Sequence, residues 1–458
     1  MRKLIALLST AVLVSGCSVG PDYVKPDIKA PQSWRIEEKD AADVANMAWW
    51  KAYGDPVLDS LIEKALKENK DLLIAAARVD EYAAQYGVAR SEFFPQIGAG
   101  ASYTQQQAKR TVTKTNQLVL NASWELDIWG KIRRSTEAAR SELLASEEGR
   151  RATVLTVVSS VASGYIGLRD LDKQLVIAKR TAKSRKESLD LFKLKFEGGV
   201  STELELAQNR SEYEQAMATI PQIEKAIAQQ EHALSILLGS NPGPIPRGKT
   251  IDELPVPMPP KGIPSEVLQR RPDILQAEQT LIAANAQIGV ARSAYFPSIS
   301  LTGLLGVSSS ELSKLFTGPA QIYSYGASLT APIFTAGKIS SQVKVAEAQQ
   351  QQALFKYQQA IQTAFKEVED GLVEQNKTRV QISAQQKQVD ALRLSASLAR
   401  LRFDNGYSNY LEVLDAERSL FSSELSYSQT QGDLHQYLIG LYKAMGGGWG
   451  VVQKQEDQ

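Results

Sequence analysis

The chain contains an internal duplication, and this feature constrains its fold more than any other. Residues 86–95 read YGVARSEFFP and residues 288–297 read IGVARSAYFP, an offset of 202 positions. Later, residues 196–199 (FEGG) match residues 403–406 (FDNG) at an offset of 207. The two offsets fit one duplication with five additional residues in a loop of the second copy. The repeat is too long for a solenoid unit, so the sequence predicts two structurally equivalent halves.

The prolines between the two copies give the boundaries of the halves. Eight prolines fall between residues 239 and 264, where they block regular secondary structure. We therefore expect a first repeat over 56–238, a Pro-rich linker over 239–264, a second repeat over 265–446 and a C-terminal tail over 447–458. Each repeat is expected to run in the order helix, two strands, long helical hairpin.

Each repeat carries two segments with the alternating pattern of half-buried strands. The clearest is 117–129, where apolar residues from Leu118 to Ile128 alternate with polar ones, with Val119 as the exception. Strands of about ten residues have the length that crosses a bilayer when tilted. A soluble sandwich is the competing interpretation, but it would need more than four strands to bury both sheets. The expected strands are 97–107, 117–129, 298–308 and 322–334.

Long helical segments follow each pair of strands. No proline occurs from Lys131 to Phe196 or from Lys338 to Phe403. Each segment could form a helix on the order of 100 Å long. Apolar residues recur at steps of three and four, which is typical of a coiled-coil seam. We expect hairpins over 131–238 and 338–445, with turns at Gly198-Gly199 and Asn405-Gly406.

Four membrane strands per chain cannot close a cylinder. In hydrocarbon an open sheet edge leaves amide groups without partners, at a cost of several kcal/mol each. Two copies would give a barrel filled by its own side chains, whereas three would leave room for a water-filled lumen. The alternating polar residues, such as Asn121 and Ser123, require water on their side of the sheet. The pattern indicates a conduit made by several copies and does not fix their number.

Composition and charge exclude several other classes of function. The 52 Lys and Arg residues nearly balance the 51 Asp and Glu residues, so no electrostatic feature favours a nucleic-acid partner. One Cys and two His residues nearly exclude a zinc cage or a Cys/His nucleophile. The sequence also lacks a P-loop. We expect no enzyme, no metal site and no cofactor, and any energy source must lie in a partner.

The N-terminus has the pattern of an export signal. Arg2 and Lys3 precede an apolar run of eleven residues, which is too short to span a bilayer. The following residues resemble the bacterial lipobox, with cleavage before Cys17 and acylation of its thiol. An ordinary signal peptide that leaves a Cys nearby is the alternative. Ser18, in place of Asp, favours the outer membrane. We expect a signal peptide over 1–16 and a lipid-anchored segment over 17–55.

Several motifs together resemble the TolC-like outer-membrane factor family, in its lipoprotein branch serving resistance–nodulation–division (RND) efflux pumps. The matching motifs are WWKAYGDP at 49–56, RRPD at 270–273, PIF at 332–334 and NYLEVLDAERS at 409–419. The resemblance implies a mixed α and β membrane protein, a homotrimer. Its twelve-stranded outer-membrane β-barrel, with four strands per chain, continues into a long α-helical periplasmic barrel of coiled-coil hairpins. The Pro-rich linker would then lie in the equatorial region of this barrel.

The resemblance also implies partners and a location. The trimer would sit in outer-membrane lipid of a Gram-negative bacterium, anchored by its acyl group and extending into the periplasm. There it would contact a periplasmic adaptor protein and an inner-membrane RND pump. The hairpin tips, with Gly198, Gly199, Asn405 and Gly406, would be the surface on which the adaptor docks.

The resemblance to this family also implies a gate, which would lie on the helix that follows the second hairpin turn. Leu411 would form an apolar ring and Asp415 an acidic ring, with Glu412 and Arg418 as neighbours on one helix face. Three Asp415 carboxylates near the axis would repel one another and gain from a nearby Arg or a bound cation. The competing interpretation is a solvated coiled-coil surface. The first repeat has Leu204 and Gln208 at the equivalent positions, so the acidic feature is not duplicated.

The expected function is a passive, gated outer-membrane conduit for drugs and other small toxic compounds. The same tunnel could instead export metal ions or polypeptides. The low numbers of Met (five) and His (two) argue against a dedicated copper or silver path, because soft cations favour thioether and imidazole ligands. A structural lipoprotein that braces the envelope with coiled coils is a further alternative.

Overall fold

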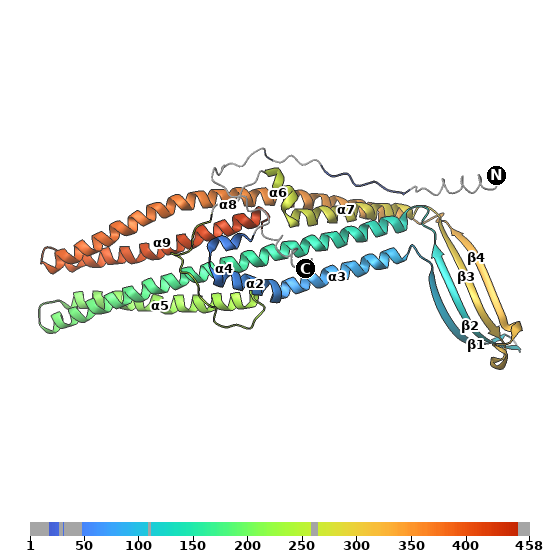
Figure 1. Ribbon diagram of the computed structural model, residues 1–458, viewed down its shortest axis with the longest axis horizontal. Helices are drawn as coiled ribbons and strands as arrows, with labels where there is room; N and C mark the ends of the chain where they lie inside the picture. Colours follow the sequence, from blue (N-terminus) through green and yellow to red (C-terminus); the bar gives the residue numbers. More distant parts are fainter. Residues whose placement is uncertain (1–17, 27–30, 32–47, 109–110, 258–263, 448–458) are drawn as a thin grey trace. The chain divides into compact units, whose positions relative to one another are not determined.

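The computed structural model describes residues 18–26, 31, 48–108, 111–257 and 264–447. The signal peptide, Cys17 and nearly all of the expected tail lie outside these residues. Its described residues divide into two compact units, the first containing 18–26, 77–148 and 274–360, and the second containing 48–76, 149–273 and 361–447. Its elements, labelled in Figure 1, are η1 Trp49–Tyr53, α2 Pro56–Glu68, α3 Lys70–Ser91, β1 Gln96–Ala108, β2 Thr111–Glu125, α4 Lys131–Glu197, α5 Glu203–Leu237, α6 Pro264–Arg270, α7 Pro272–Ser293, β3 Ser298–Ser309, η2 Leu312–Lys314, η3 Gly318–Ala320, β4 Gln321–Thr330, α8 Lys338–Asp404 and α9 Tyr410–Ala444.

The four strands form one antiparallel sheet in the order β1-β2-β3-β4 (Figure 1). Leu120 lies opposite Ala99 on one side and Leu305 on the other, and Leu305 lies opposite Tyr323. Directly opposed residues share a face of a sheet. This register therefore places most of the apolar residues of the four strands on one face.

The second face of the sheet is mostly polar and small. It carries Gly98, Ser102, Gln117, Asn121, Ser123, Thr302, Gly326 and Ser328, together with the apolar residues Val119, Leu304 and Ile322. The apolar face, in contrast, carries Ile97, Ala99, Ala101, Tyr103, Leu118, Leu120, Ala122, Trp124, Leu301, Leu305, Val307, Tyr323, Tyr325 and Leu329. A sheet with one apolar and one wet face is the arrangement of a membrane strand that lines a lumen.

Two of the expected strands have different bounds in the structure. β2 begins at Thr111, six residues before the predicted start at 117, and ends at Glu125 instead of 129. The early part is almost entirely polar, so its hydropathy pattern gave no strand signal, although its Thr residues favour extended backbone. The strand ends because the Asp127 carboxylate accepts hydrogen bonds from the backbone N–H groups of Ile132 and Arg133 and so caps α4.

β4 ends at Thr330 instead of 334. Pro332 follows and cannot donate to a strand ladder. The next residues, Ile333 and Phe334, are 95% and 88% exposed, so they pack on no described part of the chain. They lie just before α8, which begins at Lys338 as predicted.

The helix expected at the start of the first repeat consists of two helices, α2 and α3. Asn69 separates them, since its side chain donates to the carbonyl of Leu237 and accepts from the N–H of Leu72. Asp55 caps α2 by accepting from the N–H of Val57. Pro56 occupies the first helical position, where its missing N–H costs nothing.

The motif at 49–56 builds the core of the second unit. Trp49 is 1% exposed and stacks on Tyr442 with ring centroids 5.1 Å apart. The buried Asp55 carboxylate accepts from the Tyr165 hydroxyl at 2.7 Å and from the Lys249 N–H at 3.0 Å. The motif therefore joins η1 to α4 and α9, and its Trp and Pro residues serve packing and turn formation.

Among the described helices, α4 contains an 18-residue stretch apolar enough to span a membrane by length and composition. However, 56% of that stretch is buried inside the protein, as in the core helix of a water-soluble domain. The apolar seam between helices explains this composition without a transmembrane helix.

Candidate functional site: the hairpin turns and the contacts between hairpins

The two hairpin turns have the same backbone geometry. Gly199 and Gly406 both have φ of 76°, the left-handed conformation that glycine adopts at little cost. In each turn the residue after this glycine bonds back to the helix end, Val200 N–H to the Lys195 carbonyl and Tyr407 N–H to the Arg402 carbonyl, both at 2.9 Å. This is the Schellman pattern that satisfies terminal helix carbonyls.

The return helices are both capped just after these turns. Thr202 and Glu205 form a reciprocal capping box at the start of α5. Asn409 caps α9 by accepting from the N–H of Glu412 at 3.3 Å. Glu412 is therefore placed in the first turn of α9, where a negative charge is favourable.

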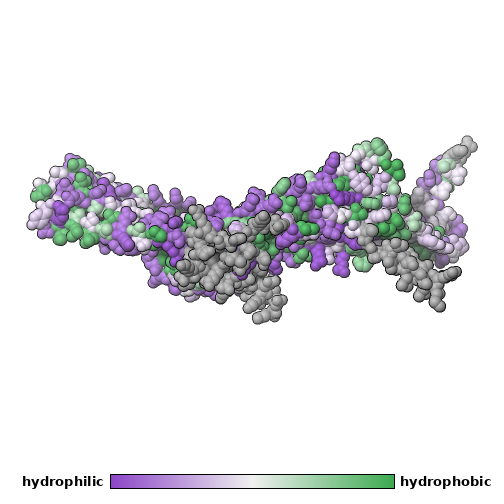
Figure 2. Space-filling view, turned by 90° about the horizontal axis from the view of Figure 1, so that it is seen from above, coloured by the Kyte–Doolittle hydropathy of each residue, from purple (hydrophilic) through white to green (hydrophobic). Residues whose placement is uncertain are grey.

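The tips expose apolar side chains beside the glycines. Gly198, Gly199, Asn405 and Gly406 are all exposed. Val200 and Tyr407, the residues that follow the two glycines, are 77% and 79% exposed. Figure 2 shows hydrophobic residues among hydrophilic ones around the hairpin turns of the second unit. Each turn thus presents one large apolar side chain at equivalent positions.

An aromatic cluster lies behind the tips and joins the two hairpins. Phe192 of α4 contacts Tyr410 of α9 with ring centroids 4.2 Å apart, and Phe403 of α8 lies 4.9 Å from Tyr410. Val413 and Leu414 are buried in the same cluster. The first turns of α9 are therefore anchored by one face of the helix.

The opposite face of α9 carries the residues assigned to the gate. Leu411 is 53% exposed and Asp415 is also exposed, although their neighbours Val413 and Leu414 are buried. Glu412 is exposed as well. The structure thus places Leu411 and Asp415 together on a surface that no described part of the same chain covers.

Arg418 turns to the other hairpin. Its Nε donates to Oε1 of Glu212 on α5 at 2.5 Å. Arg185 of α4 lies 3.1 Å from Oε2 of the same carboxylate and also donates to the Glu212 backbone carbonyl. Within the chain the partner of Arg418 is Glu212 and not Asp415, because the rotation of α9 points Arg418 towards α5.

A second ionic group lies one and a half turns further along α9. The Glu424 carboxylate, 5% exposed, accepts from Arg180 of α4 and from Arg393 of α8 at 2.9 Å. Between the two groups, burial raises the pKa of the Glu417 carboxyl, while Arg400 and Arg185 act in the opposite direction. These side chains line a cleft of about 410 Å³ between the hairpins.

The sequence did not reveal Glu212, Arg185 or Glu424. They could have been recognised as charged residues at positions of the coiled-coil seam where apolar residues are expected. A charged side chain buried in such a seam needs a partner of opposite charge. In the described residues, no group of three or more His, Cys, Asp or Glu side chains is arranged to hold a metal ion.

Comparison with known proteins identifies the family. The model of the outer membrane efflux protein family matches residues 61–240 and 263–447. The chain belongs to this family. It is an outer-membrane channel component of an efflux system, and the outer membrane is its location.

Individual relatives cover nearly the whole of this efflux protein. It is 37% identical over 453 residues to the cation efflux system protein CusC of Escherichia coli O6:H1, covering 96% of this chain and 97% of the relative. It is also 37% identical over 459 residues to the solvent efflux pump outer membrane protein SrpC of Pseudomonas putida, with 96% and 97% covered. The crystal structure of the Campylobacter jejuni CmeC outer membrane channel superposes with a TM-score of 0.91 at 27% identity, covering 96% of this chain and 98% of that one.

Proposed function

We propose that three copies of the chain form a twelve-stranded barrel that opens into a helical conduit. The observation that carries this proposal is the sheet, with its four strands, one apolar face and one polar face. Its edge strands β1 and β4 have free hydrogen-bonding groups, which in hydrocarbon must be paired with another chain. Three copies supply enough strands to surround water, with the polar face inward.

The conduit is passive and gated in this proposal. Leu411 and Asp415 would form an apolar and an acidic ring, with Glu412 and Arg418 next to them. Their exposure on the uncovered face of α9 supports this role. The link from Arg418 to Glu212 would hold the second hairpin against the first while the gate is closed. The chain performs no catalysis, and an inner-membrane RND pump supplies the energy.

The tips are proposed as the docking surface of a periplasmic adaptor. The support is the exposure of Gly198, Gly199, Asn405 and Gly406 together with the apolar side chains Val200 and Tyr407. Apolar residues exposed at the end of a soluble coiled coil are typical of an interaction site. Near the N-terminus, Cys17 is the proposed site of acylation, and its acyl chains would anchor the protein in the outer membrane.

The cargo is proposed to be drugs and other small toxic compounds. Equal identity to a cation efflux protein and to a solvent efflux protein gives no preference between cargoes. The low number of Met and His residues speaks against a path dedicated to soft metal ions. Metal-ion or polypeptide export through the same tunnel is the second candidate.

Deletion of the gene tests this function. We expect greater susceptibility to antibiotics and bile salts, restored by the wild-type gene but not by a variant lacking the tip residues 198–200. Increased sensitivity to silver or copper alone would contradict the proposed cargo. Native mass spectrometry of the detergent-extracted protein should give three copies, and a water-soluble monomer would contradict the conduit itself.

A further inference from the structure

A pocket lies on the apolar face of the sheet, at the end far from the helices. It has a volume of about 880 Å³ and is lined by β1, β2 and the connection between β3 and β4. Its lining includes Tyr103, Lys114, Asn116 and Leu118. The register places these four on the apolar face, since Tyr103 opposes Asn116 and Leu118 opposes Val307. Five of the seven strand residues that line the pocket lie on the apolar face, whereas Ser102 and Gln117 belong to the polar face. The pocket therefore lies mainly on the lipid-facing side of the sheet.

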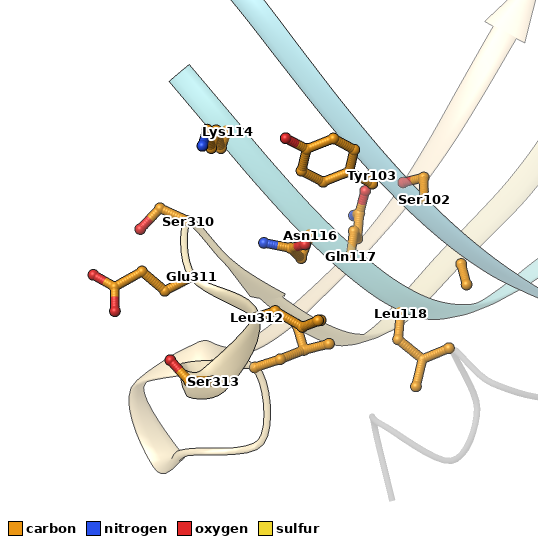
Figure 3. A pocket seen from close by; sticks show the side chains of 12 residues that line it. Ser102, Tyr103, Lys114, Asn116, Gln117, Leu118, Ser310, Glu311, Leu312 and Ser313 are labelled. Atoms are coloured by element: carbon orange, nitrogen blue, oxygen red, sulfur yellow. The ribbon is translucent and has the colours of Figure 1, made fainter. Parts of the chain in front are cut away.

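The connection between β3 and β4 forms the other wall. Leu312 and Leu315 line the pocket from this side, and Leu315 is 6% exposed. Leu312 and Phe316 remain 69% and 78% exposed. Figure 3 shows Leu312 beside Leu118 at one end of the pocket, with Lys114 at the other end. The pocket is therefore apolar at one end and basic at the other.

The position of this gradient matches the outer boundary of the membrane. On the apolar face, apolar side chains extend along the strands from the level of Leu329, near the helices, to the level of Tyr103. The next pair of opposed residues on that face is Gln105 and Lys114. Lys114 consequently lies in the first row beyond the apolar band. This is the depth at which lipid headgroups meet the protein.

The charge at this boundary is positive. Glu311, the acidic side chain of the lining, forms an ion pair with Lys314 at 2.9 Å. No carboxylate of the described residues lies in ion-pair contact with Lys114, which is exposed. Ser310 and Asn116 add polar groups on the Lys114 side of the pocket, and Ser313 lies near Leu312 (Figure 3).

We propose that this pocket binds a phosphorylated glycolipid of the outer leaflet. Lys114 contacts a phosphate of the headgroup, the Ser and Asn side chains contact its sugar, and the acyl chains lie along Leu118 and Leu312. An ammonium group pairs well with phosphate oxygens. The volume is within the usual range for a small-molecule site. The pocket is continuous with the lipid-facing side of the sheet, so the ligand reaches it within the membrane.

Native mass spectrometry of the detergent-purified full-length protein tests this site. The probes are diphosphoryl lipid A, the same lipid without phosphates, and phosphatidylethanolamine. The wild type should retain diphosphoryl lipid A preferentially, and Lys114→Gln should bind it about tenfold more weakly, as for a lost charge-assisted hydrogen bond. Lys114→Arg should retain binding.

Lys344→Gln is the control, because it removes the same charge at an exposed position of α8 that lies outside the pocket lining. Equal losses in both Gln variants would overturn the proposal, as would equal retention of the three lipids by the wild type. If Lys114→Gln fails to assemble, the binding of the three lipids to the wild type still tests whether the site prefers the phosphorylated glycolipid. Retention of phosphatidylethanolamine alone, which also carries a phosphate, would identify the pocket as an ordinary phospholipid contact and reject the glycolipid as its ligand.

Discussion

Arg418 of α9 and Glu212 of α5 form an ion pair that links the two helical hairpins, with Nε 2.5 Å from Oε1. The Glu212 side chain is only 6% exposed and has Arg185, 4% exposed, as its second partner. Removing one member of such a group leaves a charge with little solvent to replace the lost partner. The pair is therefore a specific contact that the hairpins must break when they separate.

Replacing Arg418 by Ala is expected to favour the open channel. The lost hydrogen bond to a charged group is worth about 1.5–3 kcal/mol, which would shift a closed–open equilibrium by about tenfold or more. Single-channel conductance in planar bilayers measures this shift. Arg402→Ala is the control, since Arg402 is an exposed basic residue near the same tip that forms no ion pair within the described part of the chain. Equal conductance of wild type and Arg418→Ala would exclude the pair as a lock.

The proposed gate residues give a second prediction. Leu411→Ala combined with Asp415→Ala should raise the single-channel conductance and lower the preference for cations. The reason is that the double variant removes both the apolar constriction and the ring of negative charge. The control is Leu204→Ala with Gln208→Ala, at the equivalent positions of the first repeat, which should leave the conductance unchanged. A low conductance in the gate variant would identify this face of α9 as an ordinary solvated surface.

Strand number, hairpin length and turn position could be predicted because each depends on local pattern. The turns require Gly199 and Gly406 wherever the hairpins lie. The alternation over 117–129, interrupted only at Val119, gives the lipid face. The partner of Arg418 could not be predicted in the same way. Glu212 lies 206 residues away, and the contact depends on how α9 is rotated about its axis. A heptad pattern shows which side of a helix is buried, but it does not show which residue of a neighbouring helix a given side chain meets.

The two faces of the sheet give a third prediction. Leu305 lies between Leu120 and Tyr323 on the apolar face, whereas Thr302 lies on the polar face. Leu305→Lys should destabilise the assembled protein by about 2–4 kcal/mol, because a charge is placed in hydrocarbon. Thr302→Lys, on the same strand, should be tolerated. Heat-modifiable oligomer on gels and abundance in the outer membrane report the difference. Equal behaviour of the two variants would contradict the assignment of faces.

The two histidines of the chain offer a matched pair for pH dependence. His435 of α9 is 3% exposed and lies 5.5 Å from the Tyr53 ring, whereas His232 of α5 is exposed. Burial lowers the pKa of His435 to about 4 from its usual value of 6.5. Between these values the unfolded chain binds a proton that the folded chain does not, so stability rises with pH across this window.

The wild type should therefore lose stability as the pH falls from 6.5 towards 4, by an amount on the order of 3 kcal/mol at the lower end. His435→Phe removes the proton-binding group and keeps the ring, so it should flatten this part of the curve. Thermal unfolding followed by circular dichroism at pH 7.5, 6, 5 and about 4 measures the slope. His232→Gln is the control, because it removes the other imidazole of the pair from an exposed position, and it should retain the wild-type slope. If His435→Phe leaves the slope unchanged, the acid sensitivity arises from other groups, and the carboxylates between the hairpins are the next to substitute.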